Sequence, residues 1–169
     1  MDFNFILEKK YLLLKMIFNQ SKFEDLIKWK NEFKISKTLK TIEELPVYEE
    51  IYFKSPHFEE FIEDNNLSEE MNKLMETETY KKYYDETRDY LNNIEGNWKE
   101  NKNFINNWLE KTLKIDFPKE KIPVYTSHPN LNTGVCVDEK YIFWGHYRGI
   151  DDPHYNNIYL CHEMLQFLL

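Results

Sequence analysis

The chain has 169 residues, with 30 acidic against 22 basic side chains and a formal net charge of -8, which argues against a nucleic-acid binder that works by neutralising phosphates. Its hydrophobic content of 41% and aromatic content of 17% exclude a disordered chain and suffice for one ordinary core. No apolar run approaches the roughly 18 residues that cross a bilayer, and the N-terminus lacks a signal-peptide pattern. Two cysteines, Cys136 and Cys161, cannot build a disulfide framework. We therefore expect a soluble, cytoplasmic protein with neither nucleic-acid nor membrane partners; the oligomeric state stays open.

The first two thirds of the chain have a helical pattern. From residue 1 to about 117, apolar residues recur every three or four positions and the first glycine is Gly96. The predicted helices are a first one from Phe3 to Ile17, a second that opens after Ser21, a short one that starts at Pro56, a long one from Met71 that ends before Gly96, and another from Trp98 to Leu113.

The pattern changes at Pro118. Residues 122–125 predict a short strand, and the proline inside it favours an edge position. Residues 134–137 and 141–145, separated by three residues, predict a hairpin. A polar loop follows, and Asn156 or Asn157 is expected to cap a final helix.

These elements predict an α+β fold. We expect a mostly helical region over residues 1–117, then a small antiparallel β-sheet with a C-terminal helix packed across it over residues 118–169. Together they are expected to form one compact unit.

The final helix carries one polar stripe. At about 100° of rotation per residue, Tyr159, His162, Glu163 and Gln166 share one arc of the helix, while Cys161 points to the apolar side. A surface helix usually carries lysine and glutamate on its wet side, whereas these side chains suit the lining of a site. The position of Cys161 argues against its use as a nucleophile.

The stripe lies close to a zinc-hydrolase motif. In the His-Glu-x-x-His motif, two histidines one turn apart hold one zinc ion and the adjacent glutamate acts on the zinc-bound water. His162 and Glu163 match the first two positions, and Gln166 stands where the second histidine belongs. Residues from about Lys121 to Leu169 resemble the core of zincin metallopeptidases, in which an edge strand and a hairpin precede the active-site helix.

The resemblance implies a zinc cofactor, a peptide or protein substrate, His162 as a zinc ligand and Glu163 as the catalytic base. The amide oxygen of Gln166 is a poorer zinc ligand than an imidazole, so we expect impaired affinity and activity. Zincins usually take a third ligand from beyond this helix, but the sequence ends three residues after Gln166. His146 and His154, in the preceding loop, are therefore the further candidate zinc ligands.

Four other side chains are candidates for stabilising an oxyanion, namely Arg148, His154, Tyr155 and Tyr159. The leading hypothesis is a zinc metallopeptidase-like protein with impaired or absent activity. The alternative is a non-catalytic protein-binding module, or pseudoenzyme, with an acidic, aromatic helical surface. A structural helical protein with no site is the third hypothesis.

Overall fold

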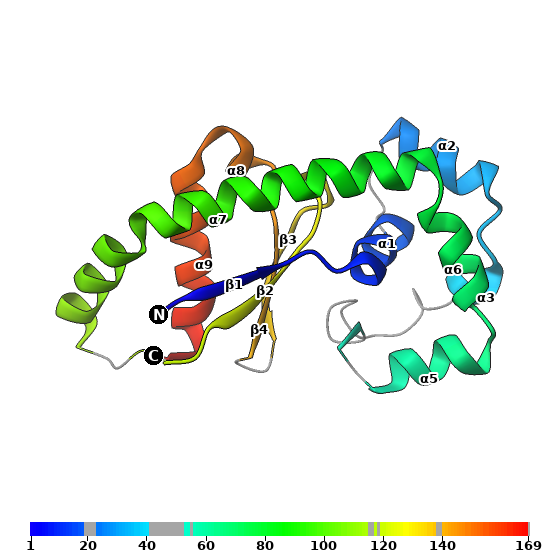
Figure 1. The fold of residues 1–169 in the computed structure, drawn as a ribbon. Helices are drawn as coiled ribbons and strands as arrows, with labels where there is room; N and C mark the ends of the chain where they lie inside the picture. Colours follow the sequence, from blue (N-terminus) through cyan, green and yellow to red (C-terminus); the bar gives the residue numbers. More distant parts are fainter. Residues whose placement is uncertain are drawn as a thin grey trace. The chain divides into compact units, whose positions relative to one another are not determined.

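The computed structural model describes residues 1–18, 23–40, 53–54, 56–114, 117, 119–137 and 140–168 (Figure 1). Helices and a four-stranded sheet coexist in it, which confirms the α+β class. Its contacts define two compact units. Residues 1–7 and 86–169 form the sheet unit, and residues 8–85 form the helical unit. The chain therefore divides differently from a boundary at residue 117, because the first strand and part of the long helix belong with the sheet.

The helical unit contains α1 (Lys9–Phe18), α2 (Glu24–Glu32), α3 (Lys37–Lys40), α5 (Pro56–Asp64), α6 (Ser68–Met75) and the start of α7 (Glu78–Leu113). All residues of α1 from Tyr11 to Phe18 are buried, and Lys15 is the one charged residue among them. The short helix predicted at Pro56 is confirmed. The predicted opening at Ser21 lies outside the described residues.

A break separates α6 from α7, where the sequence predicted one continuous helix. The Thr77 hydroxyl donates to the Leu74 carbonyl at 2.6 Å and accepts hydrogen bonds from the Tyr80 N–H at 3.3 Å and from Trp29 Nε1 at 2.9 Å. This one hydroxyl therefore helps to end the first helix, helps to begin the second and contacts α2. A hydroxyl in that local role competes with the helical hydrogen bonds.

The sheet unit contains β1 (Phe3–Ile6), β2 (Ile122–Thr126), β3 (Thr133–Val137), β4 (Tyr141–Gly145), the short 3-10 helix η2 (Pro129–Leu131), α8 (Arg148–Asp151) and α9 (Pro153–Leu168). The strand order is β1-β2-β4-β3, with β2 parallel to both of its neighbours and β3 antiparallel to β4. The predicted hairpin is confirmed. The sheet is mixed, not antiparallel as predicted.

Helices α7 and α9 contribute to a single core with the sheet (Figure 1). Residues from alternate positions of the strands contribute to it, as expected for one face of a pleated sheet. The buried members of this core are Phe3, Tyr90, Ile94, Trp98, Leu109, Ile122, Val124, Cys136, Ile142, Trp144, Leu160, Cys161 and Met164.

The N-terminus is a strand, and the prediction of a helix from Phe3 was wrong. Phe3 pairs with Ile122 of β2, and its ring lies 4.6 Å from that of Trp98. The helical spacing of the apolar residues belongs to α1, which starts at Lys9. The four residues of β1 are too few to show the two-residue alternation of a strand apart from the helical pattern that follows. Their structure is decided by pairing with β2, more than a hundred residues later.

Gly96 does not end a helix, because α7 continues through it. A glycine inside a helix costs about 1 kcal/mol relative to alanine. Ile94 and Trp98, on either side of it, are both buried in the core. Continued burial on that face offsets the local cost.

Pro123 lies in an internal strand, and the predicted edge position was wrong. β2 has β1 on one side and β4 on the other. The register with β4 starts at Val124, whereas Pro123 is matched only with Asn4 of β1. The proline, which lacks a donor for the ladder, therefore precedes the segment that pairs on both sides.

The last helix begins earlier than predicted. It starts at Pro153, and the Asp152 carboxylate accepts from the His154 N–H at 3.0 Å. Asn156 and Asn157 are buried inside the helix and are not its caps. Proline in the first turn is well tolerated because its missing N–H has no partner there.

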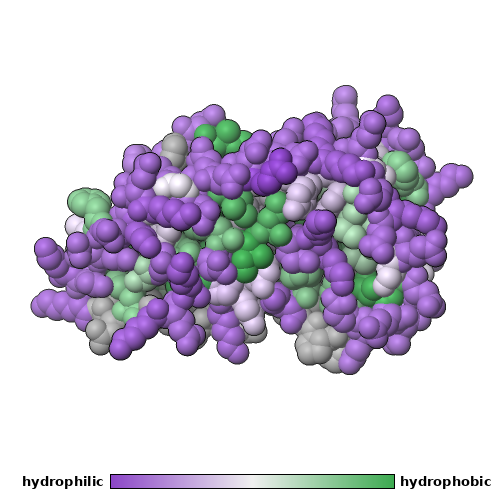
Figure 2. All heavy atoms as spheres, viewed as in Figure 1, coloured by the Kyte–Doolittle hydropathy of each residue, from purple (hydrophilic) through white to green (hydrophobic). Residues whose placement is uncertain are grey.

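The surface in view is dominated by hydrophilic side chains (Figure 2). Among the described helices, none combines the length and the apolar character that crossing a membrane demands.

Candidate functional site

Two parallel strands end side by side at one edge of the sheet, which we call the carboxyl edge. Thr126 of β2 is matched with Trp144 of β4, and the Ser127 N–H donates to the Trp144 carbonyl at 2.8 Å. A Cβ on Gly145 would collide with Ser127, so the close approach of the two chain segments requires glycine. His128 and His146 follow these strand ends. Sites in sheets of parallel strands commonly form at this edge.

A buried hydrogen-bond network joins α7, β4, α8 and α9. The Asn156 Oδ1 atom accepts from the Tyr90 hydroxyl at 2.7 Å and from Trp144 Nε1 at 2.8 Å, while Asn156 Nδ2 donates to the Gly149 carbonyl at 3.0 Å. The Tyr90 hydroxyl also lies 3.3 Å from the His146 N–H. Burial raises the pKa of Tyr90 to about 12, so this hydroxyl keeps its proton. The network fixes the segment that begins at His146 against α9.

Gly149 lets α8 approach this network. A Cβ at that position would overlap the Asn156 side chain, which is itself held by three partners. The glycine in the predicted polar loop is therefore required for packing. It permits a one-turn helix to lie directly on α9.

His146 is held through both ring nitrogens. Its Nδ1 atom accepts from the Arg148 N–H at 3.2 Å, and its Nε2 atom lies 3.3 Å from the Tyr155 hydroxyl. Burial and the nearby Arg148 charge lower the pKa of His146 below its usual value. A neutral ring that accepts at Nδ1 carries its proton on Nε2 and directs it to Tyr155.

Aromatic rings form a continuous series along α9 and the segment before it. We call His146, Tyr147, Tyr155, Tyr159 and His162 the ring ladder. Successive ring centroids are 4.7 Å apart for His146 and Tyr147, 4.8 Å for His146 and Tyr155, 4.3 Å for Tyr155 and Tyr159, and 6.0 Å for Tyr159 and His162. Tyr155 and Tyr159 are one helical turn apart, which explains their stacking.

The ladder rests on the core and reaches the surface. Trp144, which is buried, lies 6.3 Å from the rings of His146, Tyr155 and Tyr159. Tyr147 is 50% exposed and Tyr159 is 39% exposed. The ladder is thus a positioned surface, not part of the core.

One cation accompanies the ladder. The Arg148 guanidinium lies 5.9 Å from the centre of the Tyr147 ring. Hydrogen bonding to Tyr147 raises the pKa of Arg148 above its usual value. Burial and the neighbouring Tyr159 raise the pKa of Tyr155, although Arg148 opposes this. Tyr155 therefore presents a neutral hydroxyl beside a permanent positive charge.

The candidate residues of the zinc motif lie at the end of this ladder. His162 is exposed, and Glu163 is half-buried beside it on α9. Gln166 is within α9, but its side chain lies outside the described part. His154 is exposed at the start of the helix. The structure places the rings of His146, Tyr155, Tyr159 and His162 in one continuous series.

The described donors do not by themselves fit zinc. Over the described ranges, no group of three or more histidine, cysteine, aspartate or glutamate side chains is placed to hold a metal ion. His146 uses both nitrogens within the protein. A stable zinc site requires three or four converging donors, so zinc binding stays a prediction here.

Cys161 is unsuited to nucleophilic chemistry. It is buried in the core, and burial raises the pKa of its thiol to about 12. The expectation that it faces the apolar side of the helix is confirmed. Only the thiolate is a strong nucleophile.

Sequence reasoning missed a second group at the carboxyl edge. His128 is buried, and its Nε2 atom lies 2.9 Å from Glu86 Oε2. The two residues are 42 positions apart, and no local motif marks them as a pair. The only local signal is the position of His128 just after a predicted strand.

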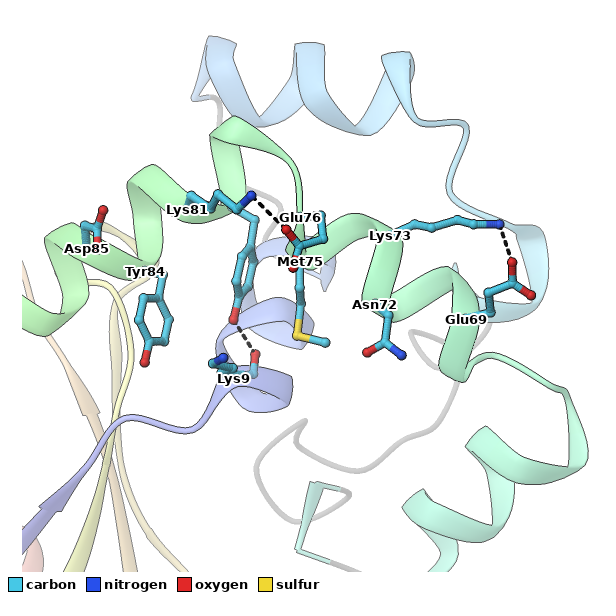
Figure 3. A pocket seen from close by; sticks show the side chains of 10 residues that line it. Lys9, Glu69, Asn72, Lys73, Met75, Glu76, Lys81, Tyr84 and Asp85 are labelled. Carbon is cyan, nitrogen blue, oxygen red and sulfur yellow. Dashed lines mark hydrogen bonds and ion pairs between the residues drawn. The ribbon is translucent and has the colours of Figure 1, made fainter.

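The helical unit has its own cavity of about 740 Å³, between α6, the start of α7 and Lys9 (Figure 3). Charges on its wall pair with one another: Lys73 with Glu69 at 2.6 Å and Lys81 with Glu76 at 2.8 Å. The Lys9 ammonium lies 5.8 Å from the Tyr84 ring centre. Because its carboxylates and lysines are largely matched, this cavity presents no clear charge preference.

The comparisons with known proteins place no relative beside this chain. No protein-family model matches it, and no curated protein and no solved structure matches it either.

Proposed function

We propose that this chain is a zincin-like, metallopeptidase-like protein whose ring ladder binds polypeptide. The observation that carries the proposal is the continuous series of neighbouring rings from His146 to His162, which reaches the surface along α9 and lies against the buried Trp144 ring. Exposed aromatic side chains supply large contact areas at low entropic cost and are enriched at protein interfaces. Arg148, at the same surface, offers donors to main-chain carbonyls or carboxylates.

The edge of the sheet supports the same proposal. Within the described residues, β3 is paired on one side only, with β4. Gly134 of β3 lies against the Trp144 ring, because a Cβ there would be 3.1 Å from it. An extended segment added to β3 would gain main-chain hydrogen bonds.

Peptide binding is testable directly. Fluorescein-labelled, reduced and alkylated casein peptides serve as unfolded polypeptide, and fluorescence anisotropy measures their affinity. We expect Tyr159→Ala and Arg148→Ala each to weaken binding about tenfold, as for interface anchors. Phe104→Ala is the matched control, since Phe104 is 75% exposed on α7 outside the ladder. An equal loss in the Phe104 variant, or no binding by the wild-type chain, contradicts the proposal.

Hydrolysis of the bound chain is the second candidate function. The specific observation is that His162 is exposed with Glu163 next to it, at the end of the ladder. It requires metal donors beyond those described, so the test is zinc stoichiometry by equilibrium dialysis with elemental analysis. The wild-type chain is measured beside Gln166→His and His162→Ala.

Three outcomes separate the candidates. About one zinc per wild-type chain, lost in His162→Ala, supports hydrolysis and calls for assays with quenched fluorescent peptides and a Glu163→Gln control. Zinc in Gln166→His alone indicates a scaffold that lacks a ligand, which favours the pseudoenzyme. Zinc in none of the variants removes the second candidate and leaves peptide binding to stand on the anisotropy result.

A further inference from the structure

A second cavity, of about 460 Å³, lies in the sheet unit, where η2 follows the end of β2. Its wall includes Glu86, Asp89 and Tyr90 of α7, His128 and Pro129 at the start of η2, and Ile150 of α8. We call it the carboxyl-edge pocket. Its volume falls in the range of about 300–1,000 Å³ that is typical of small-ligand sites.

The pocket lining contains two carboxylates, of which Glu86 is held by a hydrogen bond. His128 Nδ1 accepts from the Asn130 N–H at 3.2 Å, so a neutral His128 carries its proton on Nε2 and donates to Glu86 Oε2 at 2.9 Å. The buried imidazole therefore orients one carboxylate. Asp89 is exposed nearly one turn further along α7, and no hydrogen bond or ion pair joins its side chain to another described residue.

The pocket lining also contains apolar groups, beside the amides of Asn93 and Asn130. Tyr90 and Pro129 are buried, and Ile150 is 54% exposed. The Tyr90 hydroxyl is already used by Asn156, so its ring is what remains for a ligand. Carboxylates and apolar groups in one pocket match a cationic head on an aliphatic stem.

We propose that the carboxyl-edge pocket binds the basic side chain, lysine or arginine, of a polypeptide held on the ring ladder. This deepens the proposed function, on which it rests, by naming a substrate preference. α8 and the residue before it contribute to both surfaces, since Tyr147 belongs to the ladder, Arg148 lies beside the Tyr147 ring and Ile150 lines the pocket. Asp89 and Glu86 supply the negative charge, while the net charge of -8 favours the approach of basic segments.

A small probe tests the pocket without the rest of a peptide. Nα-acetyl-arginine methylamide and its norleucine counterpart, which has a similar stem without the charge, are titrated into the full chain and followed by ¹H–¹⁵N NMR. We expect shifts at the amides of Asp89, Tyr90 and Ile150 with the arginine probe only. Asp89→Asn should weaken this binding about tenfold, and added salt should weaken it further.

Matched variants make the result decisive. Glu100→Gln removes an exposed carboxylate from α7 outside the pocket and should leave the affinity for the arginine probe unchanged. Tyr159→Ala should also leave it unchanged, because that ring belongs to the ladder. Equal binding of the norleucine probe, no binding of the arginine probe, or an equal loss in Glu100→Gln would overturn the pocket.

A peptide experiment then separates this inference from the proposed function. A casein peptide with one arginine is compared by anisotropy with the same peptide carrying norleucine. Tighter binding of the arginine form, reduced to parity in Asp89→Asn, supports the inference. Equal affinities of the two peptides overturn the inference but leave binding on the ladder intact. If the small arginine probe binds and neither peptide does, the pocket is supported and the proposed function is contradicted.

Discussion

Two buried tryptophans lie at opposite ends of the same parallel strands and have different surroundings. At the amino end, Trp98 packs on Phe3 and its Nε1 donates to Asp2 Oδ1 at 3.0 Å. At the carboxyl edge, Trp144 Nε1 donates to Asn156 at 2.8 Å and lies 3.1 Å from the Tyr90 hydroxyl. Both side chains are 1% exposed.

The surroundings of the two tryptophans indicate that the carboxyl edge has a role beyond packing. Trp98 fastens the N-terminal segment to α7 with one hydrogen bond to Asp2 and a tilted ring contact with Phe3. Trp144 belongs to a buried polar network and also supports exposed rings. Buried polar networks are costly unless every member has a partner, so the network around Trp144 favours the carboxyl edge as the place where function is expected.

Removing the packing tryptophan should have the largest effect. We expect Trp98→Ala to lower the free energy of unfolding of the sheet unit by about 4 kcal/mol, because it leaves a large cavity under β1. Trp108→Ala, on the same helix but 58% exposed, should change it by less than about 0.5 kcal/mol. Urea unfolding followed by far-UV circular dichroism measures both. Similar losses in the two variants would mean that Trp98 does not anchor the strand.

Removing the centre of the polar network should come next. Asn156→Ala removes the acceptor that the Tyr90 hydroxyl and the Trp144 N–H share, and it removes the donor to the Gly149 carbonyl, so we expect a loss of about 3 kcal/mol. Asn92→Ala, at an exposed position of α7, is the matched control and should cost little. The same urea titration measures this pair. A loss near zero for Asn156→Ala would show that water replaces its hydrogen bonds.

The sequence predicted elements better than their partners. The hairpin, the Pro56 helix and the α+β class followed from local spacing and turn residues. The N-terminal strand did not, because four residues near Phe3 take their structure from pairing with Ile122. Gly96 is a similar case. The sequence shows that a glycine lowers the local stability of a helix, but it does not show the buried core contacts of Ile94 and Trp98 that offset this loss.

The same limit explains what could be predicted of the candidate site. The stripe on the last helix and the candidates His146, Tyr155 and Tyr159 were found from rotation and residue type, and the structure places their rings together. The sequence predicts that Asn156 or Asn157 caps the final helix, because asparagine at a helix start usually has that role. The partners of Asn156 in the structure come instead from three other elements, α7, β4 and α8. The pair of Glu86 and His128 joins residues 42 positions apart, a distance at which local patterns carry no information.

Gly149, beside the polar network, and Gly96, inside α7, differ in how much space surrounds them. A Cβ on Gly149 would overlap Asn156, so Gly149→Ala should cost about 2 kcal/mol. A Cβ on Gly96 would meet nothing within 4 Å, and that residue is inside α7. Gly96→Ala should therefore stabilise the protein by about 1 kcal/mol. Thermal unfolding of both variants gives opposite shifts if the close approach of α8 to α9 is real, and shifts of the same sign if it is not.

The smallest expected effect is a difference in pH dependence between the two ends. The folded state favours neutral His146, because burial and Arg148 lower the pKa of that ring. Above about pH 6.5 the ring is neutral in the folded and the unfolded state, and the stability that it contributes is fully present. Below that pH the unfolded chain binds the proton first. The free energy of unfolding therefore falls as the pH drops toward the lowered pKa of the folded state. Asp2, at the other end, behaves differently: burial opposes its ionisation, but hydrogen bonds from Trp98 and Lys102 outweigh this and hold its pKa below the usual value. The stability that Asp2 contributes is present above about pH 3.9 and is lost only in stronger acid.

NMR titration of the His146 ring and unfolding at about pH 7.5 and about pH 5.5 test this difference. Arg148→Gln should raise the pKa of His146 only part of the way to its usual value, because burial remains, and should flatten the loss of stability over this interval. Asp2→Asn should leave that interval unchanged and flatten the loss in stronger acid instead. If Arg148→Gln leaves the titration of His146 where it was, the guanidinium does not act on the ring. Burial alone would then keep His146 neutral. The Arg148 guanidinium beside the ladder would have no role in that protonation state, and its charge would be available to bind a ligand.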